Sequence, residues 1–159
     1  MGNYRYRRDE KAGESPYLKW PDRHGMVRDG TKESLMAGHL HIHVIDPDFR
    51  RRARIAYEMA HRNLHAEIYD TLEEFGSRMP DAGAIFVADE PERCNPRDLR
   101  TMLESSGSAL PVAAYCDEPS PQRIVEARRA GSLDYLRWPF DPKLLETALA
   151  RLSVEGEPR

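Results

Sequence analysis

The segment that decides the fold runs from Ala130 to Phe140 and reads AGSLDYLRWPF. Gly131 is expected to end a helix over residues 122–130, because glycine readily adopts the left-handed backbone that follows many helices. Residues 133–137 then predict a short strand, and Trp138-Pro139 leads from that strand into a loop. The segment therefore indicates a helix, a strand and a loop in direct succession.

The same alternation continues backwards along the chain to residue 40. Short apolar runs predict strands at 40–45, 66–69, 84–88 and 111–115, and helical periodicity predicts helices at 49–64, 72–78, 96–103 and 143–152. The run AIFVA at 84–88 is apolar throughout, as expected of a strand buried on both faces of a parallel sheet. Five strands alternating with five helices predict an α/β fold with a doubly wound, five-stranded parallel sheet.

The first predicted helix, over residues 49–64, is amphipathic. Ile55, Tyr57 and Met59 recur at helical spacing among arginines. We expect these arginines to form a basic outer face: Arg50, Arg51, Arg52 and Arg54.

The chain divides into three parts by composition. Residues 1–38 are polar and lack a sustained apolar period, so we expect a mobile, mostly irregular N-terminal extension. The aromatic cluster Tyr17 to Trp20 within it keeps open a docking role for this extension. Residues 39–152 form the predicted domain, and residues 153–159 are expected to be a linker or tail.

Composition restricts the classes of partner. The 24 basic and 27 acidic residues are mixed along the 159-residue chain, so no strong single-sign field favours direct nucleic-acid binding. No stretch has the length of a membrane span, and the N-terminus lacks the apolar core of a signal peptide. Cys94 and Cys116 stand far apart without metal-ligand spacing. We therefore expect a cytoplasmic protein with reduced thiols and no membrane contact.

Polar residues follow the predicted strands where ligand sites gather in doubly wound sheets. Because parallel strands end at the same edge of the sheet, several carboxylates are expected to converge there. The residues that follow the first, third and fourth strands are Asp46, Pro47, Asp48, Asp89, Cys116 and Asp117.

The segment from residue 130 to residue 142 resembles the receiver domains of two-component response regulators, in particular those of the NarL/FixJ type. These domains typically show Ala-Gly-Ala-x-Asp-Tyr-Leu-x-Lys-Pro-Phe at this place. Leu110-Pro111-Val112 and the interval from Cys116 to Trp138 support the resemblance, which covers residues 40–152. It implies a flavodoxin-like receiver topology and a role in signal transduction or a phosphorelay.

The resemblance also implies a pocket for Mg²⁺ and a phosphoryl group. Asp89 matches the phosphoacceptor, although a shift of one residue would place Ala88 there. Asp46 matches the first Mg²⁺-binding acid, Pro47 replaces the second, and Asp48 is a candidate substitute. A weak Mg²⁺ site formed by Asp46, Asp48 and Asp89 is therefore the expected cofactor site.

Four further positions match the switch residues of receivers. Cys116 replaces a hydroxyl residue and Trp138 replaces a lysine, so a phosphoryl group would lose a charged partner worth about 1.5–3 kcal/mol. Tyr135 matches the aromatic that reports activation, and Pro139 matches a proline whose peptide bond is usually cis. We expect weak or absent phosphorylation, and Trp138 is a candidate to fill the phosphate pocket.

The leading hypothesis is an atypical receiver, a pseudo-receiver, which acts on a histidine kinase or on an output domain that regulates transcription. The alternative is a phosphorylation-independent protein-interaction adaptor, and either could form a homodimer. An enzyme is not expected, because the first strand is followed by acids in place of a glycine-rich phosphate loop.

Two further sets of residues carry weaker hypotheses. The alternating His39, His41 and His43 are expected to be half-exposed rather than to bind a metal. The other set would form a basic surface, either solvated or facing an acidic partner: Arg123, Arg128, Arg129 and Arg137.

Overall fold

The computed structural model describes residues 40–155, and the extension 1–38, His39 and residues 156–159 lie outside this range. Five parallel strands form one sheet in the order β2-β1-β3-β4-β5. They are β1 (His41–Ile45), β2 (His65–Tyr69), β3 (Ala84–Ala88), β4 (Val112–Cys116) and β5 (Asp134–Arg137). The predicted fold class is confirmed.

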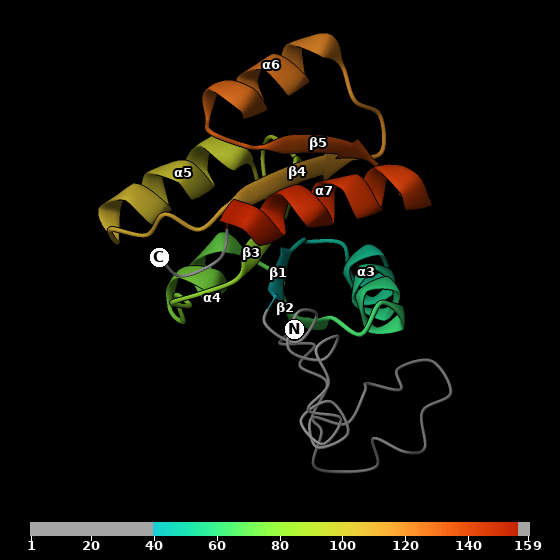
Figure 1. The fold of residues 1–159 in the computed structure, drawn as a ribbon. Coiled ribbons are helices and arrows are strands. Elements are labelled where there is room, and N and C mark those ends of the chain that lie inside the picture. The colour runs from blue at the N-terminus through green and yellow to red at the C-terminus, as the bar shows by residue number, and fades with distance from the viewer. Residues whose placement is uncertain (1–39, 156–159) are drawn as a thin grey trace.

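Five helices connect and cover the strands (Figure 1). They are α3 (Phe49–His61), α4 (Leu72–Gly76), α5 (Pro96–Ser105), α6 (Pro121–Arg129) and α7 (Pro142–Glu155). None of the helices in residues 40–155 is long and apolar enough to cross a membrane.

Polar side chains set the starts of the helices. The Asp48 carboxylate, the Thr71 and Ser120 hydroxyls and the Asn95 amide oxygen each accept a hydrogen bond from a backbone N–H in the first turn that follows. Such caps satisfy N–H groups that have no partner within the helix. These four caps fix where α3, α4, α5 and α6 begin.

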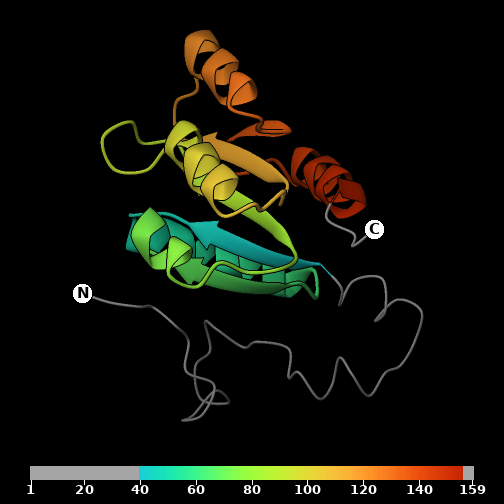
Figure 2. The ribbon, with the colours of Figure 1, turned by 90° about the vertical axis from the view of Figure 1, so that its left-hand side faces the viewer.

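The core has two parts, one on each face of the sheet, because successive side chains of a strand point to opposite faces. Val44, Phe86 and Tyr115 pack with residues of α3 and α7 on one face. Ile45 and Val87 pack with residues of α4, α5 and α6 on the other. Figure 2 shows α6 beyond the β5 end of the sheet, away from α3.

The structure corrects the predicted outer face of the first helix. Arg51 and Arg52 are buried, at 7% and 3% exposure, on the side of α3 that carries Ile55, Ala56 and Met59. These positions share the inward side because residues three and four apart lie on one face of a helix. Only the remaining arginines of the predicted set, Arg50 and Arg54, are exposed.

Two other expectations are also corrected. His43 is buried rather than half-exposed, and its ring nitrogens contact the Tyr69 hydroxyl and the Ala82 carbonyl oxygen. Helix α7 continues through Glu155, three residues beyond its predicted end at residue 152, so the start of the expected linker is helical.

Candidate functional site

The acidic residues that follow the strands form two clusters. The Asp46 side chain contacts Arg51 of α3 on one face of the sheet, and the Asp89 side chain lies beside Arg123 of α6 on the other. We call Asp46, Arg51, Glu90, Tyr115 and Asp117 the Asp46 cluster, and Asp89, Cys116, Arg123 and Tyr135 the Asp89 cluster. The alternation of side chains at the strand ends thus separates carboxylates that the sequence predicted together.

Asp46 is fully buried and accepts hydrogen bonds on both carboxylate oxygens. Oδ1 accepts from the Asp48 backbone N–H at 2.8 Å and from Arg51 Nη2 at 2.9 Å. Oδ2 accepts from Arg51 Nε at 2.6 Å and from the Tyr115 hydroxyl at 2.7 Å. A carboxylate with four such donors is well compensated for its removal from water.

Arg51 links three loops at this edge of the sheet. Beyond Asp46, its Nη2 donates to Glu90 Oε1 at 2.6 Å, and its Nη1 donates to Asp117 Oδ1 at 3.2 Å. Burial alone would lower the pKa of Arg51, but the hydrogen bonds and negative charges of Asp46 and Glu90 outweigh burial and raise this pKa. Arg51 is therefore a permanent cation among carboxylates.

Tyr115 stays a neutral donor within the same cluster. Burial, together with the adjacent charge of Asp46, raises the pKa of its hydroxyl well above the ordinary value. The guanidinium carbon of Arg51 also lies 5.7 Å from the centre of the Tyr115 ring, within the range of a cation–π contact.

Asp89 follows β3 directly and is nearly buried. Its Oδ2 accepts a 2.6 Å hydrogen bond from the Tyr135 hydroxyl and lies 3.6 Å from Arg123 Nε. Arg123 Nη2 donates to the Asp89 backbone carbonyl at 2.9 Å. Asp89 thus contacts both β5 and α6, whereas Ala88, the alternative acceptor position, is a buried strand residue without a reactive group.

Tyr135 points inward to Asp89 and Cys116. Its hydroxyl oxygen lies 3.1 Å from Cys116 Sγ. Because a tyrosine has one hydroxyl proton, that proton serves the Asp89 carboxylate, and the thiol can donate its own proton to the tyrosine oxygen. Burial and these two contacts raise the pKa of Tyr135, so it remains a neutral donor.

The residues predicted to hold Mg²⁺ do not fit that ion as they are arranged. Within residues 40–155 no group of three or more histidine, cysteine, aspartate or glutamate side chains is placed to hold a metal. Asp48 Oδ1 caps α3 by accepting from the Arg51 backbone N–H at 2.9 Å, and Arg51 occupies Asp46. Since Mg²⁺ requires several oxygen ligands in near-octahedral geometry, it would have to displace the guanidinium.

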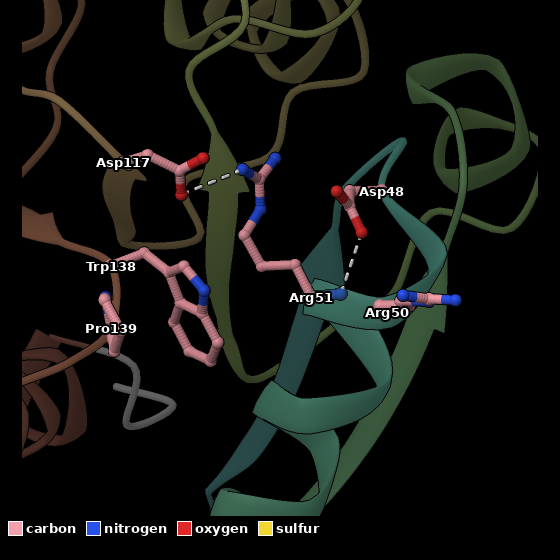
Figure 3. A pocket seen from close by; sticks show the side chains of 6 residues that line it. All are labelled: Asp48, Arg50, Arg51, Asp117, Trp138 and Pro139. Atoms are coloured by element: carbon pink, nitrogen blue, oxygen red, sulfur yellow. Dashed lines mark hydrogen bonds and ion pairs between the residues drawn. The ribbon is translucent and has the colours of Figure 1, made fainter.

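An open pocket of about 420 Å³ lies beside the Asp46 cluster (Figure 3). Trp138 forms one wall and faces Arg51 across the pocket. The Trp138 ring packs edge to face on Phe140 with 4.9 Å between ring centres, and its peptide bond to Pro139 is cis, as the resemblance implied. The lining residues are Asp48, Arg50, Arg51, Asp117, Trp138 and Pro139.

Sequence reasoning missed the roles of two arginines. Arg51 and Arg123 were both predicted to lie on basic surfaces, yet each turns inward to a strand-end carboxylate. The uncharged Trp138, at a position where the resemblance implies a lysine, was the available signal, because buried carboxylates are usually paired. Nothing in the sequence shows which of the neighbouring arginines provides it.

Comparisons with known proteins identify the fold. Neither family models nor curated proteins match the sequence. Among solved structures, FixJ-N has a TM-score of 0.67 and 20% identity, with 76% of this chain and 98% of that chain covered. The beryllofluoride-activated DrrB receiver domain has a TM-score of 0.60 and 18% identity, with 71% and 96% covered.

A full-length response regulator shows the same similarity of fold over part of its chain. Full-length FixJ from B. japonicum has a TM-score of 0.66 and 20% identity, with 74% of this chain but only 59% of that chain covered. The described domain therefore has the flavodoxin-like fold of response-regulator receiver domains.

Proposed function

We propose that this chain is an atypical receiver module of signal transduction, in which Arg51 takes the place of a bound divalent cation. In this proposal Asp89 is phosphorylated weakly, and a complete absence of phosphorylation belongs to the second candidate, an adaptor. The observation that carries the proposal is the guanidinium of Arg51, held by the carboxylates of Asp46, Glu90 and Asp117.

Charge balance supports weak phosphorylation. A phosphoryl group on Asp89 would add negative charge near the Asp46 cluster, and transfer normally relies on a metal ion and cationic side chains to offset that charge. Arg51 already serves three carboxylates, and Trp138 has no positive charge with which to replace the family's lysine. Among residues 40–155, the cation beside Asp46 is thus already paired, and position 138 offers no charge to the incoming group.

The Asp89 carboxylate is itself engaged. Its Oδ2 is hydrogen-bonded to Tyr135 and lies beside Arg123, and the side chain is 9% exposed. An attack on a phosphodonor would require a carboxylate oxygen of this buried side chain to reach solvent. This arrangement supports slow reaction at Asp89.

The partner proposed for this module is a protein: a histidine kinase, an output domain or a second copy of the chain. Full-length FixJ and the response regulator StyR extend beyond the part that this chain matches, because only 59% and 61% of their chains are covered. Regulation of transcription through a separate or attached output domain is proposed on that basis. A cytoplasmic location is part of the same proposal.

A phosphorylation-independent adaptor is the second candidate. The Asp46 carboxylate already accepts four hydrogen bonds, two of them from Arg51, and this favours the adaptor. A pocket that contains its own cation needs no external ion to keep one conformation. The two candidates differ only in whether Asp89 can be modified.

Treatment with acetyl phosphate, or with beryllofluoride and Mg²⁺, tests the proposal. Intact mass and amide chemical shifts would be recorded for the wild type and for Asp89→Ala. Detectable modification of less than about a tenth of the wild-type molecules supports the atypical module, since full reaction needs the missing charge-assisted contacts. Rapid, complete, Asp89-dependent modification would contradict it, and no detectable reaction would favour the adaptor.

A further inference from the structure

Helix α6 has little apolar attachment to the domain. Of its nine residues only Ala127 is buried, whereas the ten-residue α5 buries Pro96, Leu99 and Leu103. Val125 on α6 is 46% exposed. Because helices in proteins are held mainly by burial of an apolar face, the position of α6 must depend on other contacts.

Arg123 supplies such contacts from the first turn of α6. Its Nη2 donates to the Asp89 backbone carbonyl at 2.9 Å, and its Nε lies 3.6 Å from Asp89 Oδ2. Its Nη1 lies 3.9 Å from Cys116 Sγ at the end of β4. One side chain thus joins α6 to the ends of the two adjacent strands β3 and β4.

The contacts are sheltered from water. The Arg123 side chain is 29% exposed and the Asp89 side chain is 9% exposed. Hydrogen bonds to charged groups at such sites contribute more than those at a fully solvated surface. Asp89 is also fixed from β5 by Tyr135, so the carboxylate that Arg123 contacts has a defined position.

We propose that Arg123 is a latch that fixes the first turn of α6 to Asp89, so that removing the charge of Asp89 loosens α6. The latch needs no phosphoryl transfer, and it links the strand-end site to the outer surface of α6, which carries Val125, Arg128 and Arg129. Arg123 thus holds α6 in position and takes no part in a chemical step.

Amide hydrogen exchange of the full chain tests the latch. We compare the wild type with Arg123→Gln and with the matched control Arg128→Gln, which alters an exposed arginine on the same helix. Arg123→Gln is expected to raise exchange of the α6 amides about tenfold, the effect of losing one hydrogen bond from a charged donor. Exchange in β1 and β3 should change less than about twofold, as should α6 exchange in the control.

Dependence on charge is tested with Asp89→Asn. This variant keeps the backbone carbonyl contact and loses the ion pair, so α6 exchange should rise by a smaller factor, about threefold. In the double variant Asp89→Asn/Arg123→Gln the increase in α6 exchange should not exceed that of Arg123→Gln alone. The reason is that both substitutions remove the same ion pair between Arg123 and Asp89.

Three results would overturn the latch. The first is that α6 amides exchange at the same rate in Arg123→Gln and in Arg128→Gln. The second is that exchange in Arg123→Gln rises by the same factor in the strands as in α6. The third is independent, multiplying effects of the two substitutions. If Arg123→Gln does not fold, Arg123→Lys replaces it, since one ammonium nitrogen cannot reproduce the separate contacts of Nε, Nη1 and Nη2 with the carboxylate, the thiol and the carbonyl. Unchanged α6 exchange in that variant also overturns the proposal.

Discussion

Arg51 and Asp46 form a buried, two-point ion pair, with Nε 2.6 Å from Oδ2 and Nη2 2.9 Å from Oδ1. The arginine stands in the first turn of α3, directly after the loop that leaves β1, and its side chain turns back to the end of that strand. Glu90 and Asp117 complete its partners. The protein therefore carries a cation of its own at the strand ends, and several consequences can be measured.

Replacing Arg51 with methionine is expected to lower the free energy of unfolding by about 3–5 kcal/mol, because it leaves the buried charge of Asp46 without its partner. Urea unfolding followed by circular dichroism measures this change. The matched control is Arg50→Met, at the neighbouring exposed position, which should change stability by less than about 0.5 kcal/mol. Equal effects at the two positions would show that the ion pair is unimportant to the fold.

Removal of Arg51 should also create a site for Mg²⁺. With the guanidinium gone, the oxygens of Asp46, Glu90 and Asp117 become available to a hard cation. At a concentration ten times its Kd, Mg²⁺ should stabilise Arg51→Met by about 1.4 kcal/mol, since it binds the folded state alone. The melting temperature of the wild type should not respond beyond the effect of KCl at equal ionic strength. A similar Mg²⁺ response of both proteins would contradict cation replacement by Arg51.

A pocket closer to that of ordinary receivers should result from Arg51→Met combined with Trp138→Lys. The first change frees carboxylates for Mg²⁺, and the second adds an ammonium opposite them to pair with phosphoryl oxygens. We expect acetyl phosphate and Mg²⁺ to modify the double variant at least about tenfold faster than the wild type, as one charge-assisted contact would give. Phosphate-affinity gel electrophoresis follows the reaction, and addition of Asp89→Asn should abolish it. No gain in rate would mean that these two residues do not limit the reaction.

The stability of the domain should fall on mild acidification because of His43. Burial lowers the pKa of this imidazole from its ordinary 6.5, although the Ala82 carbonyl and the charge of Glu67 oppose that shift. The unfolded chain therefore takes up a proton before the folded one does. Stability present above pH 6.5 is lost as the pH falls below this value, and the loss ends below the pKa of the folded state.

His43→Gln tests this pH dependence, because an amide can still meet Tyr69 and Ala82 without titrating in this range. Urea midpoints at pH 7.5 and 5.5 should differ less in the variant than in the wild type. Parallel losses in the two proteins would assign the acid sensitivity to other groups.

Periodicity in the sequence was sufficient to predict every strand and helix of the described domain. The strand at residues 84–88 matches its predicted bounds, because five apolar residues between polar loops leave little choice of register. Helix ends differ by a few residues, as at α3, which ends at His61 rather than at residue 64. Asn63 has a positive φ of 58°, so the chain leaves the helical conformation there.

The site was predictable only in part. Parallel strands end at one edge, so the sequence placed Asp46 and Asp89 at that edge correctly. It did not reveal that their side chains lie on opposite faces of the sheet, nor that Asp48 is committed to capping α3. These features depend on the register of adjacent strands and on the path of a short loop.

The sequence by itself determined the α/β class, the order of elements and the resemblance of residues 130–142 to receiver domains, because local patterns and short connections specify them. Only the tertiary structure decided that Arg51 and Arg123 face inward. An arginine on an amphipathic helix can serve either solvent or a buried carboxylate, and the choice depends on where distant strands bring Asp46 and Asp89. Contacts between Arg51 and Asp117, 66 residues apart, cannot be deduced from local sequence.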